Sequence, residues 1–404
     1  MKRLLFITHQ FPLPLDVGSK IRAFNLLKIY SKNYRVTVVA LINGHSEGKY
    51  VPELEEICER VVVVDRASCR RFQSDGSKIP RLIRSAFSLY PKVVLGFESK
   101  EFTTAIKNVI EKDFYSVIHV SRIYSATNIA FVLRRKDNVK LILDMDDYES
   151  SKIFREVRIL RCFRRRLELF HDFCRVFVFE SFFVRKFDFC LVCNGEDRDR
   201  LCKRFKKATR IEVIHNGVSS SHFSHSGGFE IEGNILFLGA MDYEPNIDAV
   251  NYFLKKSWPL IRNSYPRCTF TIAGRNPAQE IRDMHNGKDI IVMPDVLDVR
   301  NVLEKCAVMA VPLRLGGGMR IKILEAMAMK RAIVSTSMGC EGIGATHSEN
   351  ILIADDASDF AEQCLRVLKD KFLREKLGNN ARAFVEHNYD WFVVERKLLS
   401  LCQN

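Results

Sequence analysis

Short apolar runs alternate with amphipathic stretches along most of the chain. Each apolar run has the length of a strand, and the stretches between them repeat apolar residues every three or four positions, as in 20–31, 358–369 and 375–387. A strand buried on both faces gives an unbroken apolar run, whereas a helix that covers a sheet shows the 3.6-residue rhythm. The pattern therefore predicts parallel sheets covered by helices. The predicted strands are 3–8, 35–41, 61–64, 117–120, 141–145, 189–193, 211–215, 234–239, 269–273, 290–293, 308–312, 332–336 and 351–354.

The predicted strands fall into two series, one on each side of a segment without periodicity. That segment, 219–233, is rich in Ser, Gly and His and follows the sequence HNGV at 215–218. Two βα series in one chain predict an α/β protein with two doubly wound, Rossmann-like domains. We therefore expect an N-terminal domain over 1–218, a linker over 219–233 and a C-terminal domain over 234–388.

One predicted helix, 153–177, carries arginines opposite its apolar face. Its apolar residues recur at helical spacing, and the arginines are Arg155, Arg158, Arg161, Arg165 and Arg166. Two interpretations stay open. The helix either faces the core with a solvated basic side, or lies on an anionic membrane and contacts it through Arg158, Arg161 and Arg165. The run VFVFESFFV at 176–184 adds aromatic surface and favours the second interpretation.

Composition and charge restrict the class of protein. Hydrophobic residues make up 47% of the 404 residues and charged residues 28%, values that exclude a disordered chain. The formal net charge of +14 indicates an anionic partner, such as a nucleotide, a phosphate, a nucleic acid or a lipid head group. No recognised nucleic-acid-binding module accompanies this charge, so we expect no nucleic acid partner.

Targeting and redox signals are few. The apolar part of MKRLLFITHQFPLP is too short to predict a signal peptide, and no run approaches the ~18 apolar residues of a spanning helix. We therefore expect a cytoplasmic protein, peripheral on the inner face of the cell membrane if the basic helix binds lipid. The twelve cysteines are expected to be free thiols. Cys190 and Cys193 form a CxxC, but on a strand their side chains face opposite ways, which does not suit zinc.

The segment 312–330, PLRLGGGMRIKILEAMAMK, combines features of an anion-binding site. A predicted strand ends there, and the glycines Gly316, Gly317 and Gly318 precede a run of good helix formers. A glycine loop at a helix N-terminus presents free backbone N–H groups and the positive end of the helix dipole. The alternative is a structural turn with basic residues on its surface.

Two cations and one acid follow these glycines. Arg320 and Lys322 are expected in the first helical turn, where positive charge opposes the dipole unless an anion is bound. A di-anion at the loop would neutralise both side chains. Glu325, a little further along the helix, can accept hydrogen bonds from a diol. The glycines, the cations and the acid together favour an anion site over a structural turn.

Three weaker candidates lie in the first half of the chain. Gly18 follows the first strand and would let the backbone approach a ligand, although neither GxGxxG nor GxxxxGK[ST] is present. The acidic sequence DMDDYE at 144–149 follows a strand and could bind Mg²⁺ or cap the next helix. His119 lies on a strand, either as a core residue or as a cleft residue that contacts substrate. We assign no metal site.

These segments resemble family 4 of the retaining GT-B glycosyltransferases, and most of all the group that includes the PEP-CTERM and exopolysaccharide-associated sugar transferases. The C-terminal half carries the more specific motifs, and the N-terminal half shows a looser similarity. The motifs are GAMDYEPNIDAVNYFLKKSWPLIR (239–262), FTIAGRNP (270–277), PDVLDVRNVLEKCAVMAVPLRLGGGMRIKILEAMAMKRAIVST (294–336), NYDW (388–391), FPLPLDVGSKIRAFNLL (11–27), LDMDDYESSKIF (143–154) and HNGV (215–218).

The resemblance implies the GT-B fold, in which two Rossmann-like domains face a cleft and the last helix, here 389–404, crosses back to the N-terminal domain. The C-terminal domain would bind a nucleoside-diphosphate sugar, and the N-terminal domain the acceptor. Glu325 matches the second acid of the family's E-x7-E motif, which binds the ribose hydroxyls. The first acid falls at Gly317, and the family's Arg and Lys after the first C-terminal strand fall near Met241 and Asn246, so all three are missing.

These departures lead us to infer that Arg320 and Lys322 take over the diphosphate contacts, together with the amides of 316–318. Of the family's cleft histidine pair only His119 remains, with Ser121 in the second place. Donors aimed at the charge that develops on the leaving phosphate lower the barrier most, and such a site needs no metal ion or other cofactor. The resemblance implies retention of configuration through front-face attack.

The expected function is a retaining, metal-independent hexosyltransferase that moves a sugar from an NDP-sugar to a lipid-linked glycan acceptor in surface polysaccharide biosynthesis. The expected catalytic residues are Arg320, Lys322, Glu325 and His119. The expected donor-binding residues are Gly18, Gly316, Gly317, Gly318, Arg320, Lys322 and Glu325. One alternative is a nucleotide-sugar epimerase of the same fold. Another, suggested by Gly317, is a catalytically silent nucleotide-sugar-binding partner.

Overall fold

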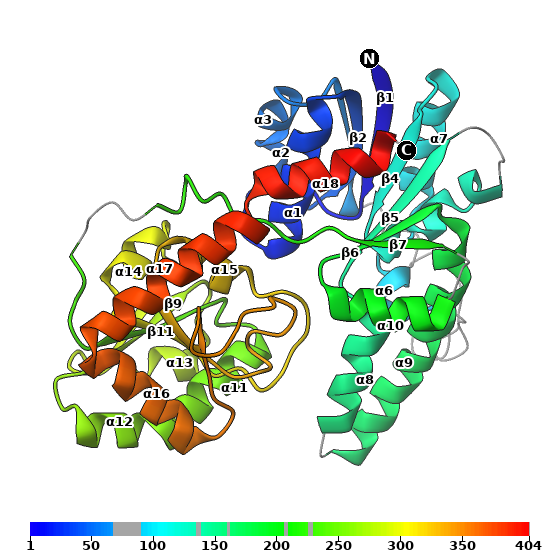
Figure 1. The fold of residues 1–404 in the computed structure, drawn as a ribbon. Coiled ribbons are helices and arrows are strands. Elements are labelled where there is room, and N and C mark those ends of the chain that lie inside the picture. Colours follow the sequence, from blue (N-terminus) through cyan, green and yellow to red (C-terminus); the bar gives the residue numbers. More distant parts are fainter. Residues whose placement is uncertain (68–89, 135–138, 160–161, 206–208, 225–228, 404) are drawn as a thin grey trace. The chain divides into compact units, whose positions relative to one another are not determined.

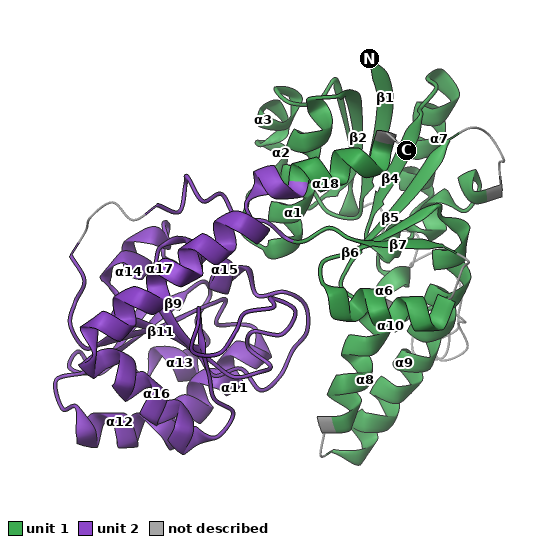
Figure 2. Cartoon of the chain, in the orientation of Figure 1, with its two compact units in different colours: residues 1–215, 395–404 green, residues 216–394 purple. Residues whose placement is uncertain are grey.

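The computed structural model describes the chain except for residues 68–89, 135–138, 160–161, 206–208, 225–228 and 404. The chain divides into two compact units (Figure 2). Unit 1 contains residues 1–215 and 395–404, and unit 2 contains residues 216–394. Unit 1 is therefore built from two separate stretches of sequence, whereas unit 2 is continuous.

Unit 1 is built on a seven-stranded parallel sheet with the order β3-β2-β1-β4-β5-β6-β7. The chain runs outward from β1 in one direction and then restarts at β4, so the order reverses between these two strands. The inner strands are apolar on both faces because helices cover both sides of the sheet (Figure 1). The strands are β1 Lys2–Thr8, β2 Tyr34–Ile42, β3 Arg60–Asp65, β4 Val117–Ser121, β5 Lys140–Asp146, β6 Phe189–Val192 and β7 Arg210–Val213.

The helices of unit 1 differ widely in length, and α9 is the longest. They are α1 Gly18–Ser31, α2 His45–Gly48, α3 Val51–Glu55, α6 Lys92–Leu95, α7 Lys100–Lys112, α8 Glu149–Ile159, α9 Phe163–Phe183 and α10 Gly195–Phe205. Short 3₁₀ turns lie at Ile123–Ser125, Thr127–Ile129, Val132–Arg134 and Val184–Lys186. Of the helices in the described ranges, none is both long and apolar enough to cross a membrane.

Unit 2 contains a six-stranded parallel sheet with the order β10-β9-β8-β11-β12-β13. Here the order reverses between β8 and β11. The strands are β8 Asn234–Leu238, β9 Thr269–Gly274, β10 Ile290–Pro294, β11 Val308–Val311, β12 Ala332–Ser335 and β13 Leu352–Ile353. Ligands of such sheets bind outside the carboxyl ends of the strands at the point of reversal.

The helices of unit 2 flank its sheet, and the last helix of the chain begins in unit 2 and ends in unit 1. They are α11 Glu244–Tyr252, α12 Trp258–Ser264, α13 Gln279–Arg282, α14 Arg300–Lys305, α15 Ile321–Ala328, α16 Ala357–Lys369, α17 Lys371–Asn388 and α18 Trp391–Gln403. In unit 1, α18 contacts the core through Leu398, which is completely buried, and Lys140 donates to the carbonyls of Leu401 and Cys402 at 3.2 and 3.3 Å.

Two parallel-sheet α/β domains confirm the fold predicted from the sequence, but one predicted helix is wrong. The segment expected as a single helix over 153–177 forms two helices, α8 and α9, that pack against each other through Phe154 and Phe173, whose ring centroids are 5.1 Å apart. Cys162 has an extended backbone immediately before α9. The apolar rhythm of the sequence continues from one helix to the next, so periodicity alone could not place the break. Arg161, expected at a membrane contact, lies outside the described residues.

Candidate functional site

The glycine loop lies in unit 2 at the carboxyl end of β11, beside the point where the strand order reverses. Gly316 and Gly318 have φ values of +103° and +76°, in the left-handed region that favours glycine. A Cβ at Gly316 would lie 3.6 Å from the Tyr243 hydroxyl and from Pro245 Cβ. The loop after β11 therefore lies against the start of α11, which follows β8.

The helix after this loop begins with no side chain hydrogen-bonded to its first N–H groups. Arg320 is the N-cap residue of α15 rather than a residue of its first turn, and that turn contains no acid. The Arg320 guanidinium donates to the carbonyls of Gly317 and Gly318 and so holds the loop in its bend. The backbone N–H groups at the start of α15 and the positive end of its dipole are consequently suited to an anion.

Lys322, the second residue of α15, is partly buried and reaches towards the end of β8. Its ammonium donates to the Leu238 carbonyl at 2.8 Å and to Asn246 Oδ1 at 3.1 Å, and it lies 4.3 Å from the centroid of the Phe237 ring. Asn246 is itself oriented, because its amide donates to the Ala240 carbonyl at 2.8 Å. Asn246, near which the resemblance would place a Lys, therefore accepts a hydrogen bond from the Lys of α15.

The ammonium of Lys322 is close to its point of half-protonation at neutral pH. Burial lowers the pKa of Lys322 to about 7, and the charge of Arg320 acts in the same direction. Burial also raises the pKa of Glu325 to about 7, while Lys322 opposes that rise. Among the described residues the Glu325 carboxylate has no hydrogen-bond partner. The Glu325 carboxylate is therefore available to a polar ligand, as is the third N–H of the Lys322 ammonium.

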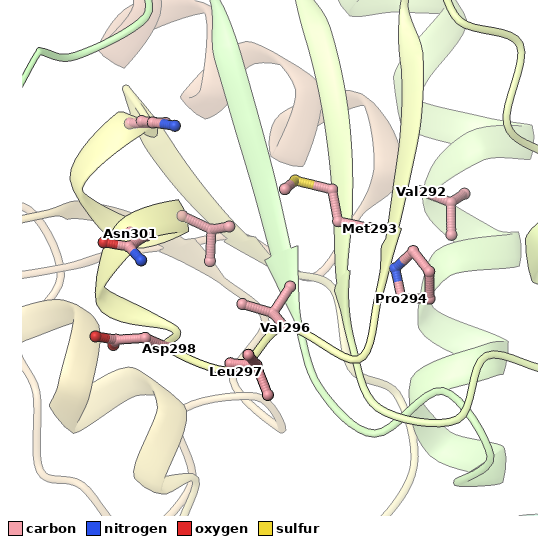
Figure 3. Close-up of a pocket in the computed structure, with 9 residues that line it drawn as sticks. Val292, Met293, Pro294, Val296, Leu297, Asp298 and Asn301 are labelled. Atoms are coloured by element: carbon pink, nitrogen blue, oxygen red, sulfur yellow. The ribbon is translucent and has the colours of Figure 1, made fainter.

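An apolar depression of about 570 Å³ lies at the end of β10, the edge strand of the same sheet (Figure 3). Figure 3 shows the Met293 side chain extending from the strand towards the helix that carries Asn301. Its apolar lining is Val292, Met293, Pro294, Val296, Leu297 and Val302, and its polar lining is Asp298, Asn301 and Lys305. Three strand spacings, about 14 Å, separate β10 from β11. Sequence reasoning missed this depression, although the apolar pair Val296 and Leu297 shortly after a predicted strand was a signal for it. In the structure Leu297 is fully exposed.

His119 does not occupy a position from which it could contact a substrate. It is completely buried on β4, stacked on Phe6 with 4.4 Å between ring centroids, and its Nδ1 lies 3.1 Å from the Tyr30 hydroxyl. Burial lowers the pKa of His119 to about 4, so the ring is neutral at neutral pH. The expected catalytic role of His119 is therefore corrected: it is a core residue enclosed by side chains that are distant in sequence.

The structure brings together only part of the expected site. The three glycines, Arg320, Lys322 and Glu325 meet in unit 2 around the start of α15. Gly18 belongs to unit 1, where it is the first residue of α1. His119 also belongs to unit 1.

The acidic sequence 144–149, at the end of β5 and just beyond it, is largely paired with arginines. Arg22 and Asp144, each 2% exposed, form a bidentate pair at 2.8 Å. Arg122 forms ion pairs with the three acids that follow, which are Asp146 at 2.7 Å, Asp147 at 3.3 Å and Glu149 at 3.0 Å. Ligand atoms of Asp146, Asp147 and Cys193 lie within 4.8 Å of one another, but Arg122 already forms an ion pair with each of the two carboxylates. The cluster is therefore built into unit 1 as ion pairs.

Comparison with known proteins shows what the chain is similar to. Residues 232–370 match the family described as Glycosyl transferases group 1. A 44.6 kDa protein of the cps region of Klebsiella pneumoniae, itself uncharacterized, is 22% identical over 400 residues, which are 96% of this chain and 97% of that protein.

Two solved structures extend the comparison to the whole chain. Sucrose-phosphate synthase from Thermosynechococcus elongatus has a TM-score of 0.70 at 16% identity and covers 100% of this chain and 98% of its own. HepE from Anabaena, solved in complex with UDP, has a TM-score of 0.67 at 11% identity, with 99% of both chains covered. The chain has the GT-B fold. The family match in unit 2 and the GT-B neighbours together support a glycosyltransferase.

Proposed function

We propose that this protein is a retaining, metal-independent glycosyltransferase of family 4 that uses a nucleoside-diphosphate sugar. The observation that carries the proposal is the arrangement at the start of α15: an uncapped helix N-terminus, the Lys322 ammonium and the Glu325 carboxylate, all in the unit that matches a glycosyltransferase family. A diphosphate, which carries two negative charges, suits the first two groups, and a diol suits the third.

The donor would extend along the carboxyl edge of the sheet. Its diphosphate would lie on the N–H groups of α15 beside Lys322, and its ribose hydroxyls would contact Glu325. Its base would enter the apolar depression at β10, since a flat apolar ring gains most from such a lining. The distance of about 14 Å between β10 and β11 is one that an extended nucleoside diphosphate covers. The crystal structure of HepE with UDP shows that a neighbour of this fold takes such a ligand.

Catalysis would come from charge stabilisation on the leaving group. As the glycosyl bond breaks, negative charge grows on the phosphate, and donors already aimed at that charge lower the barrier. Lys322 and the first N–H groups of α15 are such donors, because Asn246 and the Leu238 carbonyl fix the ammonium before the reaction begins. Arg320 would act by holding the glycine loop through its carbonyls. These groups supply positive charge without a metal ion.

The acceptor is proposed to be a glycan carried on a lipid, bound by unit 1. The relative in a cps region supports a role in surface polysaccharide biosynthesis. A second candidate, a nucleotide-sugar-binding partner without transferase activity, is favoured by one observation: position 317 carries no acid but a glycine whose carbonyl is occupied by Arg320.

Turnover of a panel of UDP- and GDP-sugars, with and without lipid-linked glycan acceptors, tests the proposal. The expected result is acceptor-dependent release of nucleoside diphosphate with retention at the anomeric carbon, lost in Lys322→Ala. Lys288→Ala is the matched control, because Lys288 is exposed and distant in sequence from the loop. Donor binding without turnover would favour the silent partner, and conversion of the donor to its epimer would favour an epimerase. No binding of any nucleotide sugar would refute the donor site.

A further inference from the structure

The helix pair α8–α9 of unit 1 is held to the rest of its unit at one end only (Figure 1). The two helices pack together through Phe154 and Phe173. All buried residues of α9 lie in its second half: Arg175, Val176, Phe179, Glu180 and Phe183. The first half, 163–174, has none. This first half is therefore supported by α8 rather than by the core of the unit.

An apolar stripe runs along α9 and remains exposed. Its members follow one another at intervals of four, three, four and three residues, which places them on one face of the helix. They are Phe163 (74% exposed), Leu167 (53%), Phe170 (47%), Cys174 and Phe177 (40%). The fourteen steps along the helix from Phe163 to Phe177 give this stripe a length of about 21 Å. A continuous exposed apolar surface of this kind marks an interaction site on a folded protein.

The end of the helix pair that lies away from the rest of unit 1 is strongly basic. Arg158 on α8 and Arg164, Arg165 and Arg166 on α9 are exposed, and the described residues between 158 and 171 include a single acid, Glu168. Glu168 lies 3.6 Å from Arg164 in an exposed i,i+4 pair, so three arginines remain without a carboxylate from this stretch. We call the stripe and the four arginines together the hairpin surface.

We propose that the hairpin surface binds an anionic lipid bilayer, with the apolar stripe entering the head-group region and the arginines contacting lipid phosphates. Helices that lie in a membrane interface combine these two features, an apolar face and flanking Lys or Arg. Arg164 and Arg166 flank the stripe on α9, and their side chains are long enough to reach the phosphates while the stripe is submerged. Arg165 lies on the opposite side of α9 and contributes through the charge that it adds near the anionic surface. A second copy of the chain would bring the arginines of both copies together, and a nucleic acid would leave the stripe in water. An anionic bilayer buries the apolar stripe and also supplies phosphates to the arginines.

Flotation with vesicles tests this proposal separately from sugar transfer. The protein is mixed with vesicles of phosphatidylcholine alone or of phosphatidylcholine with phosphatidylglycerol, at low ionic strength. We expect binding to the mixed vesicles only, weakened by added salt. Arg158→Glu/Arg165→Glu/Arg166→Glu should lower the binding constant by at least roughly a hundredfold, since each arginine near an anionic surface contributes about fivefold. Phe163→Ser/Leu167→Ser/Phe170→Ser should lower the binding constant while leaving the charge unchanged.

Matched controls lie on unit 2. Lys369, Lys371 and Lys376 are exposed, as is Phe372 at 77%. Lys369→Glu/Lys371→Glu/Lys376→Glu changes the net charge by the same amount as the arginine triple variant, and it should bind the mixed vesicles like the wild type, as should Phe372→Ser. Unchanged melting temperatures would show that the hairpin variants are folded. Absence of wild-type binding to the mixed vesicles would overturn the proposal. An equal loss of vesicle binding in the lysine triple variant would also overturn it. So would a wild-type dimer that the serine triple variant dissociates, because the stripe would then be a contact between two copies of the chain.

Discussion

Binding of the donor should be coupled to uptake of a proton by Lys322. In the free protein, burial holds the pKa of Lys322 at about 7, so above that pH most molecules have lost the ammonium charge. A unit negative charge 4 Å away contributes about 4 kcal/mol at an effective dielectric constant of 20, which is about three pKa units. A bound diphosphate should therefore return the pKa of Lys322 towards 10. The bound state then carries a proton that the free state lacks.

The sign and size of the pH dependence of donor affinity follow from the thermodynamic linkage between donor binding and proton uptake. Because the bound state holds the extra proton, donor affinity should fall as pH rises above about 7, by roughly fiftyfold between pH 7 and pH 9. The phosphates of a nucleotide sugar are diesters and do not titrate in this range. Glu325 and Arg320 are the other charged groups that act on Lys322. Glu325→Gln should keep the pH dependence, whereas Lys322→Met should bind weakly at every pH.

Isothermal titration calorimetry measures this directly. Titrations with a donor found in the panel, carried out near pH 8 in buffers of different ionisation enthalpy, should report uptake of nearly one proton by the wild type and none by Lys322→Met. Lys288→Met serves as the control and should behave like the wild type. A wild-type affinity independent of pH, with no proton taken up, would refute the reasoning.

Three further predictions concern other parts of the structure. Glu325→Gln should raise the Kd of the donor more than it lowers kcat, because diol contacts are similar in the ground and transition states; steady-state kinetics beside direct binding checks this. Arg320→Ala should lower kcat by about tenfold or more, less than the ~10²–10³ lost with a direct charge-stabilising donor, because Arg320 holds the loop through its carbonyls; kcat within about threefold of the wild type would count against this hold. Asp144→Asn should lower the free energy of unfolding by about 3–5 kcal/mol, since it leaves the buried Arg22 charge without its carboxylate; urea denaturation measures the change, and a loss below about 1 kcal/mol would contradict it.

Local sequence was sufficient for the strands and for the glycine loop. Each predicted strand lies within two residues of an observed one, because a strand buried on both faces leaves an unbroken apolar run. The loop before α15 was predictable because glycines, cations and acid lie within ten residues of one another. The break between α8 and α9 was not, since the apolar spacing of the two helices stays in phase across it.

The features of the site that the local sequence did not predict depend on contacts between residues distant in the sequence. Lys322 is fixed by Leu238 and Asn246, which lie 84 and 76 residues earlier, and no local pattern connects them. The burial of His119 depends in the same way on Phe6 and Tyr30, which come from other strands and helices. Periodicity describes which face of an element is apolar, but not which distant side chain closes over a polar group.

The return of residues 395–404 to unit 1 has a consequence for biosynthesis. Leu398 and Leu401 complete the core of unit 1, and Glu395 forms an ion pair with Lys32, so the first-made domain lacks part of its interior while the ribosome translates residues 216–394. At ~5–20 residues per second that interval lasts roughly 10–40 s. Unit 2 is continuous and has all its residues before residues 395–404 emerge. The domain synthesised first is therefore expected to be the last to reach its final state, and until then its uncovered apolar surface is exposed to aggregation.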